Sequence, residues 1–211
     1  MSIIHHPSDA TLAAFASGTL DEGRGIVVAA HLSLCAQCRN AVHAFEEAGG
    51  VLLDDVEPAV LSAGALQRAM AALGPLDIIK PAIHEGAAGD LPAPLSRYAV
   101  GPWRWIGRGV QWRPVEMVSN AGVRVFMLKA APGTKLPRHR HTGTEWTCVF
   151  EGAFTHALGR YGSGDFDEAD ESVEHDPVVD AEHGCVCLVA LQGHIELQGW
   201  LGRLIQPFVR I

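Results

Sequence analysis

The 211-residue sequence contains no long hydrophobic run, which argues against a membrane-spanning protein. Its longest unbroken apolar stretches, such as residues 26–30, have only a handful of residues. A membrane-spanning helix needs about 20. The start of the chain also lacks the basic region and the apolar core of a signal peptide. We therefore expect a soluble, cytoplasmic protein.

Basic residues are scarce in the first half of the chain. Residues 1–95 hold 4 Lys and Arg against 11 Asp and Glu, a balance of −7, whereas residues 96–211 hold 12 against 13, a balance of −1. So acidic a segment repels phosphate backbones, which disfavours direct nucleic-acid binding. It suits a basic protein surface, although acids that serve only solubility would give the same balance.

Cysteine is also scarce, and its odd count of 5 does not suit a disulfide framework. The Cys-x2-Cys and Cys-x-Cys spacings favour metal binding or redox chemistry instead. An apolar fraction of 48% is ample for packed cores, and the length allows one large domain or two small ones.

Residues 1–73 are predicted to form a small all-α domain of four helices. Pro7 stands at a first helical position, where proline is favoured. The next three helices are expected at residues 20–32, 35–49 and about 59–73. Gly49-Gly50 is expected to end the third of them. A unit this small often needs a staple such as a bound metal.

A different pattern begins at Tyr98, after a stretch at 74–96 whose many Gly and Pro residues are typical of a linker. Apolar residues now alternate in short runs between turn residues, as in β-sandwiches and barrels. Strands are expected at residues 123–128, 146–150, 185–191, 195–200 and 204–209. We therefore predict an all-β domain over residues 97–211.

A first set of metal ligands lies in the helical part. His31, Cys35 and Cys38 are spaced i, i+4, i+7, so they share one face of a helix, or form a knuckle if a helix starts between the cysteines. A fourth ligand would come from His6 or, less favoured, His5. Thiolate and imidazole together are typical of a closed structural zinc site. The alternative is two buried core thiols and a capping histidine.

A second set follows the pattern Gly-x5-His-x-His-x3-Glu-x6-Gly over residues 133–152. His139 and His141 alternate on a strand and point to one side, and Glu145 returns a carboxylate to that side after a bend. Imidazole and carboxylate ligands in this arrangement can hold Zn, Fe, Mn or Ni. Arg138 and Arg140 then face away from the metal, which disfavours an acidic substrate.

The fourth ligand of the second set is expected to be His175, with His183 as the alternative. His175 lies in an acidic stretch, residues 161–182, which holds nine Asp and Glu and no Lys or Arg. We interpret this stretch as a solvated loop face around His175, or as a surface for a partner. We expect Trp146, Phe150 and Phe154 to line the site.

Cys185 and Cys187 lie in a strand-like run, so both thiols face one way. They are predicted to be either small buried core residues or a redox-sensitive pair near the metal. Residues two apart on an extended strand are at the edge of disulfide reach.

Two family resemblances follow from these motifs. The set His6, His31, Cys35 and Cys38 in an acidic helical unit resembles the zinc-binding anti-sigma domain. The pattern at 133–152 resembles the first motif of the cupin (jelly-roll barrel) domain, whereas the region before His175 lacks the usual Pro-x-Gly of the second. Together the two modules resemble the ChrR-type anti-sigma factors over nearly the whole chain, including residues 204–208.

The resemblance implies a function and its cofactors. It implies that residues 1–73 sequester a group IV (extracytoplasmic-function) sigma factor and that the cupin domain triggers release in response to singlet oxygen or other reactive oxygen species. It implies zinc in both sites, with Fe, Mn or Ni as alternatives in the cupin, and no catalytic residues.

Two other functions fit parts of the sequence. A metal-dependent cupin dioxygenase or isomerase would use the second metal set for catalysis and the first for docking. A zinc-dependent DNA-binding regulator is disfavoured by the acidic N-terminal part.

Overall fold

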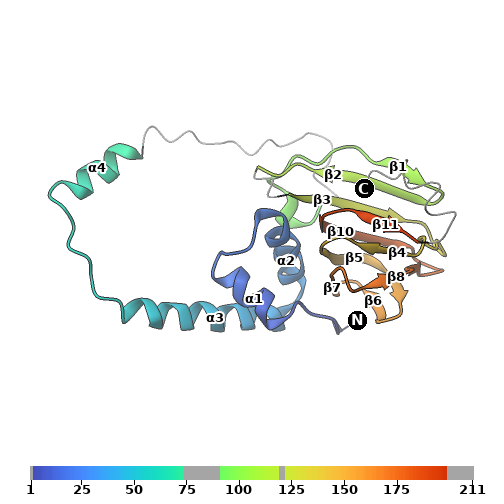
Figure 1. Ribbon diagram of the computed structural model, residues 1–211, viewed down its shortest axis with the longest axis horizontal. Helices are drawn as coiled ribbons and strands as arrows, with labels where there is room; N and C mark the ends of the chain where they lie inside the picture. The colour runs from blue at the N-terminus through green and yellow to red at the C-terminus, as the bar shows by residue number, and fades with distance from the viewer. Residues whose placement is uncertain (1, 74–90, 119–121, 199–211) are drawn as a thin grey trace.

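The computed structural model describes residues 2–73, 91–118 and 122–198. Figure 1 shows helices beside a β-barrel, and the predicted combination of a small α-helical unit with an all-β cupin-like domain is confirmed. Within the described residues, no helix is both long and apolar enough to cross a membrane.

Side-chain caps set the first three helices. Helix α1 (Asp9–Ala16) begins after Ser8, whose side chain accepts a hydrogen bond from the Thr11 N–H. Pro7 therefore precedes the cap, and its prediction as the first helical residue was wrong. Helix α2 (Glu22–Leu34) is capped in the same way by Asp21. Helix α3 (Ala36–Asp54) follows after a single extended residue, Cys35.

The glycine pair does not end α3, contrary to the prediction. The helix runs through Gly49 and Gly50 to Asp54, and both glycines keep ordinary helical geometry. Each glycine costs about 1 kcal/mol relative to alanine, which a helix of this length tolerates. Helix α4 (Ala65–Ala72) is shorter than predicted, because Gly64, at φ +76°, precedes its first turn.

The strands are antiparallel and form two sheets. The first sheet has the order β1-β2-β3-β10-β5-β6, and β7 and β9 also pair with β5; the second is β11-β4-β8. Their bounds are β1 (Arg104–Gly107), β2 (Val110–Val115), β3 (Val123–Ala130), β4 (His139–His141), β5 (Glu145–His156), β6 (Gly159–Gly162), β7 (Phe166–Ala169), β8 (Glu174–His175), β9 (Val178–Val179), β10 (Cys185–Gln192) and β11 (Ile195–Leu197).

Most of the predicted strands fall within these elements. The runs at 123–128, 146–150 and 185–191 lie in β3, β5 and β10, and β11 covers the beginning of the run at 195–200. The predicted strand at 204–209 and the motif at 204–208 lie outside the described residues.

Helix α2 packs directly on the barrel. One apolar core contains Val27 and Val28 of α2 together with Val125 of β3 and Leu188 of β10. The contact is close at Gly23, where an added Cβ would lie 2.8 Å from a methyl group of Val123. The helical unit and the barrel therefore share a core.

Part of the expected linker also joins this core. A short 3-10 helix, Ala93–Leu95, lies against α2, and Leu95 is fully buried in the shared core. Residues 74–90 of the expected linker lie outside the described residues.

Two candidate metal sites joined by one barrel segment

The first predicted ligand set comes together where α2 meets α3. His31 lies in the last turn of α2, Cys35 separates the two helices, and Cys38 lies in the first turn of α3. The His6 Nδ1 atom lies 3.5 Å from the Cys35 Sγ and 3.3 Å from the Cys38 Sγ. Candidate ligand atoms of these four residues all lie within 4.8 Å of one another.

The chemistry of this first set fits a metal ion. The His31 Nδ1–H donates to the Gly164 carbonyl at 2.8 Å, which leaves the lone pair on Nε2. That Nε2 atom is buried and has no hydrogen-bond partner among the described residues. Burial, and then the neighbouring Cys35 thiol, raise the pKa of Cys38 to about 12. A bound cation would satisfy the orphan nitrogen and favour the thiolates.

The N-terminal segment decides between the two candidate histidines. The main-chain N–H groups of Ile4 and His5 donate to the Asp165 carboxylate at 2.8 and 3.0 Å, and the Phe166 N–H donates to the His5 carbonyl. The His5 ring stacks on Tyr161 with 4.2 Å between ring centroids. His5 is thereby held against the barrel, and the next residue, His6, points to the cysteines.

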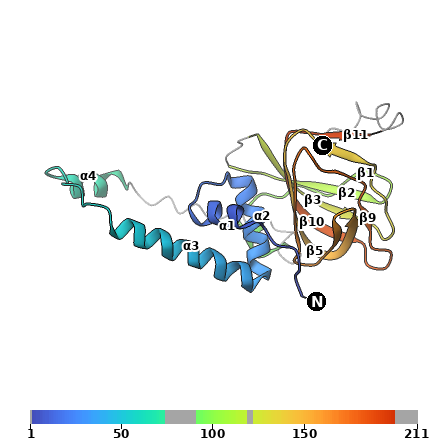
Figure 2. The same ribbon diagram turned by 60° about the horizontal axis from the view of Figure 1, so that its bottom comes forward.

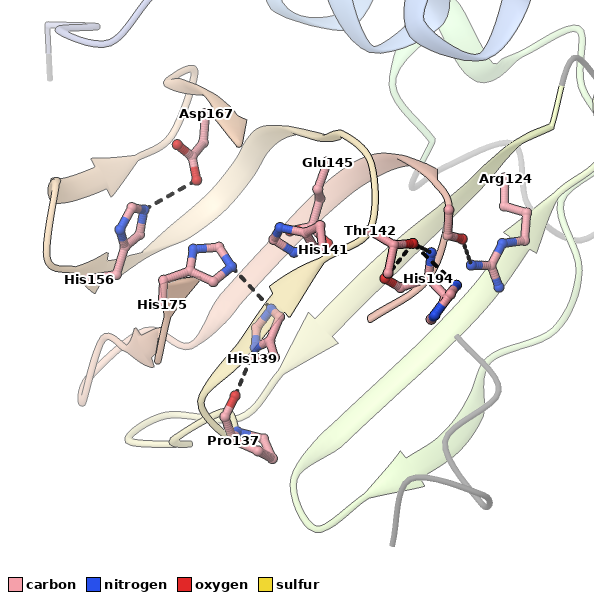
Figure 3. Close-up of polar contacts among 11 residues, drawn as sticks. Arg124, Pro137, His139, His141, Thr142, Glu145, His156, Asp167, His175 and His194 are labelled. Carbon is pink, nitrogen blue, oxygen red and sulfur yellow. Dashed lines mark hydrogen bonds and ion pairs between the residues drawn. The ribbon is translucent and has the colours of Figure 1, made fainter. Parts of the chain in front are cut away.

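The second predicted set converges inside the barrel (Figure 3). His139 and His141 occupy the two inward positions of β4, and the His141 Nε2 atom lies 3.4 Å from a carboxylate oxygen of Glu145 at the start of β5. His175 on β8 pairs with His139 across the sheet, and their Nε2 atoms are 3.0 Å apart. His183 instead lies in an exposed turn, where its main-chain N–H donates to Asp180.

The protonation states also suit a cation. Burial lowers the pKa of His139, and burial followed by the charge of His139 lowers that of His175 to about 4. Burial alone would raise the pKa of Glu145, but the hydrogen bond and charge of His141 outweigh it and lower that pKa. Neutral imidazoles at His139 and His175 are the ligand forms that a metal requires. The pKa of His141 is instead raised, because its hydrogen bond with Glu145 and the charge of Glu145 outweigh the effect of burial. His141 and Glu145 thus form a buried pair on which a bound cation would replace the shared proton.

A neighbouring pair was missed by the sequence analysis. The His156 Nε2 atom lies 3.2 Å from a carboxylate oxygen of Asp167, and both residues are buried. Figure 3 shows this pair next to His175, on the side away from His139. Asp167 falls in the acidic stretch that was interpreted as solvated. That interpretation was wrong for Asp165 and Asp167, which are both buried. Asp165 accepts a hydrogen bond from the Ile4 N–H, and Asp167 pairs with His156.

One segment of the barrel, residues 159–169, lies between the two metal sets. Its strands β6 and β7 follow one another along the same edge of β5, and we call it the β6–β7 segment. Gly164 and Asp165, between β6 and β7, hold His31 and the N-terminal segment. Tyr161 of β6 stacks on His5 on one side and on His156, a neighbour of His175, on the other, at 4.2 and 4.9 Å between ring centroids. A shift of this segment would move the acceptor of His31 and a neighbour of the second set.

A cavity of about 400 Å³ lies next to the second set, and both thiols of the Cys-x-Cys pair line it. Cys185 and Cys187 are buried and unlinked. A hydrogen bond with Cys185, and then burial, raise the pKa of Cys187 well above its usual range.

Two of the three predicted aromatic lining residues face elsewhere. Trp146 and Phe150 pack on the core shared with the helices, because neighbouring residues of a strand point to opposite sides and Glu145 points inward. The pairing of β5 with β10 is irregular between Val186 and Cys187, and beyond that point Phe154 lines the cavity as predicted.

Comparisons with known proteins agree with both halves of the fold. Residues 95–195 match the family described as ChrR Cupin-like domain. The chain is 40% identical, over all of its own length and all of the relative's, to the anti-sigma-E factor ChrR of Cereibacter sphaeroides. The chain belongs to the ChrR family of anti-sigma factors. The resemblance drawn from the motifs is thereby confirmed.

A solved structure extends the ChrR likeness to the arrangement of the two parts. The crystal structure of Rhodobacter sphaeroides SigE in complex with the anti-sigma ChrR matches with a TM-score of 0.73 and 35% identity, covering 90% of this chain and 100% of that chain. ChrR is named as an anti-sigma factor and not as an enzyme. The metal-dependent cupin enzyme is therefore set aside as the function of this chain.

Proposed function

We propose that this protein sequesters a group IV (extracytoplasmic-function) sigma factor through helices α3 and α4 and releases it on an oxidative signal received by the cupin domain. The observation that carries the first part is an uncovered apolar surface on these helices. Figure 2 shows α3 projecting from the barrel, with α4 beyond it. The SigE complex of a ChrR protein supports the same kind of partner.

The apolar surface extends over the end of α3, the following segment and α4. Its side chains are each at least 60% exposed: Val51, Leu52, Leu53, Val56, Val60, Leu61, Leu66, Met70 and Leu73. Apolar patches of this extent on a soluble chain mark interaction sites. We call these nine residues the apolar patch.

Acidic residues accompany the apolar patch. Asp54, Asp55 and Glu57 lie within it along the chain, and Glu46 and Glu47 precede it on α3. Such a surface complements a partner that combines apolar side chains with positive charge, as a DNA-binding sigma factor does. The same charge disfavours direct contact of this segment with nucleic acid.

We further propose zinc at both ligand sets, with a structural role at the first. His6, His31, Cys35 and Cys38 form a closed set of two thiolates and two imidazoles, which zinc favours. Zinc held in this way contributes about 10–16 kcal/mol to folding in finger peptides. In the cupin set His139, His141, Glu145 and His175, zinc is favoured and Fe, Mn or Ni are alternatives.

For the oxidative signal we propose the cupin site as receiver and the β6–β7 segment as the connection to α2. The contacts of this segment support the proposal, because Gly164 accepts a hydrogen bond from His31 and Tyr161 stacks on His156, which adjoins His175. Cys185 and Cys187 are candidates for the oxidised residues. Both thiols line the cavity, and since the thiolate is the reactive form, the raised pKa of Cys187 lowers its reactivity. The division into residues 1–73 and 97–211, and a cytoplasmic location, belong to this proposal.

Co-purification with group IV sigma factors of the source organism tests the proposal. The wild-type chain should retain one of them. The double substitution Leu52→Asp, Leu66→Asp should abolish retention of the sigma factor without loss of metal, because both charges are placed on an exposed surface. Leu158→Asp is the matched control, since Leu158 is 61% exposed on the barrel. Retention by none of the chains, or equal loss in the control, would show that the proposed interface is wrong.

A further variant tests the role of the first metal set. Cys35→Ala should lose one metal ion and the sigma factor together, because Cys35 caps the start of α3. The release step is tested by exposing the complex to singlet oxygen. His139→Ala should still bind the sigma factor but fail to release it, and normal release would exclude the cupin site as receiver.

A further inference from the structure

The barrel cavity has the dimensions of a small-molecule site. Its volume of about 400 Å³ falls in the range of roughly 300–1,000 Å³ typical of ligand pockets. Most of the side chains around it are apolar and come from β2, β3, β5, β10 and β11. They include Phe126, Leu128, Phe154, Val189, Ile195 and Leu197. A polar molecule would leave its hydrogen-bonding groups unpaired against these walls, so the body of a ligand must be apolar.

The polar groups of the cavity favour an anionic head on that body. His139, Glu145 and His175 of the second metal set line one part of it. The carboxylates of Glu145 and Asp167 already face His141 and His156. A divalent ion held by the metal set would balance the two negative charges of Glu145 and Asp167 in the lining. Anionic oxygen donors are ligands that such an ion accepts.

Two further cations lie in the cavity lining. Arg108 and Lys135 both belong to it and are exposed to solvent, so they are placed to attract an anion. The sequence argument against an acidic ligand relied on Arg138 and Arg140. These two residues do lie outside, where they pair with Glu174 and Glu196, but the cavity draws its positive charge from other residues.

We propose that the cavity binds a monocarboxylate with an apolar body, of the size of a medium-chain fatty acid. Its carboxylate lies at the metal set, and its body lies against Phe126, Val189 and Leu197. The proposal rests on the proposed function and deepens it, because it gives the cupin site a ligand whose binding or loss could act on the barrel. A ligand there would lie next to His175, which adjoins the His156–Asp167 pair and through it the β6–β7 segment.

Calorimetric titration of decanoate into the full-length, zinc-loaded protein tests the proposal. Saturable one-to-one binding is expected. Val189→Phe fills the cavity from β10 and should weaken binding at least tenfold, whereas Leu158→Phe on the exposed surface of the barrel should leave it unchanged. Because decanoate could also adsorb to the apolar patch, the Leu52→Asp, Leu66→Asp chain is titrated as well and should bind normally.

The head group is tested by comparison with decanol, which has the same apolar body without the charge. Decanol should bind at least tenfold more weakly than decanoate, and His139→Ala should remove that difference. Equal affinities of the wild type for the two compounds would overturn the assignment of a carboxylate.

Absence of saturable decanoate binding, or wild-type affinity in the filled cavity, would overturn the proposal as a whole. Thermal unfolding and metal content establish that each variant is folded, and Leu197→Phe, which fills the cavity from β11, replaces Val189→Phe if that chain is not. Sigma-factor retention is measured on the same preparations. Decanoate binding without sigma-factor retention would refute the proposed function alone. Sigma-factor retention without decanoate binding would refute only the proposed carboxylate ligand.

Discussion

Replacing Asp165 by asparagine should uncouple the N-terminal segment from the barrel. The carboxylate of Asp165 is 3% exposed and accepts three main-chain N–H groups, from Ile4 and His5 at 2.8 and 3.0 Å and from Gly162 at 2.8 Å. The first two bond to one carboxylate oxygen and the third to the other. An asparagine keeps only one acceptor oxygen, so its NH2 group must face either Gly162 or the N-terminal segment.

The magnitude follows from these contacts. A hydrogen bond to a charged group contributes about 1.5–3 kcal/mol, and a buried N–H left unpaired costs about 1–3 kcal/mol. Asp165→Asn loses at least one such bond and weakens the others, so the free energy of unfolding should fall by about 2–4 kcal/mol.

Urea unfolding of the zinc-loaded protein measures this loss. Zinc release to a chromogenic chelator should also accelerate, because His6 follows the two residues that Asp165 holds. Asp170→Asn is the matched control, since the carboxylate of Asp170 accepts hydrogen bonds from the main-chain N–H and the hydroxyl of Ser172 within an exposed turn, and the change should stay within about 0.5 kcal/mol. Equal stability of the Asp165→Asn chain and the control, with unchanged zinc release, would refute the reasoning.

Three other outcomes are expected. Gly152→Ala should destabilise the barrel by more than about 3 kcal/mol in urea unfolding, because Gly152 has φ +68° and its added Cβ would overlap the Gly184 carbonyl oxygen. A loss below about 1 kcal/mol would contradict this. His139→Ala should lower the metal content measured by elemental analysis by one ion per chain while the first site keeps its zinc, and unchanged content would exclude His139 as a ligand. In metal-free protein, the folded pKa of His175 is lowered to about 4, whereas its unfolded value is near 6.5. Between these values the unfolded chain binds a proton that the folded chain does not, so stability should fall as pH falls below 6.5. The expected loss from this group between pH 7 and pH 5 is about 2 kcal/mol. A His175→Gln chain should show a shallower fall, and equal slopes would refute the assignment.

The neighbouring members of the two candidate ligand sets could be predicted because their spacing carries the geometry, whereas His6 and His175 come from distant parts of the chain. His139 and His141 need only a strand to point the same way, and His31, Cys35 and Cys38 need only the junction of two helices. The fold class followed from the change in apolar period near Tyr98. In each case the interactions that decide the outcome lie within a few residues of one another in the chain.

What the sequence analysis missed depends on contacts between distant segments. His5 and His6 are adjacent on an extended segment, and only the stacking of His5 on Tyr161 decides which of them faces the cysteines. Asp165 and Asp167 resemble their exposed acidic neighbours in sequence, and their burial follows from partners on other elements. The Gly49-Gly50 pair also misled the prediction of where α3 ends, because glycine is common after a helix but is also tolerated within a long one.

The hold of Asp165 on the N-terminal segment has a consequence for biosynthesis. Ile4 and His5 leave the ribosome about 160 residues before the carboxylate that receives them. At about 5–20 residues per second, that interval is about 8–32 seconds. During this time the helices can form, but His6 lacks the support that directs it to Cys35 and Cys38. In a nascent chain the four candidate ligands of the first set can therefore come together only after the β6–β7 segment has been made, so a chain stalled before residue 165 should hold the proposed zinc ion without the full support of His6.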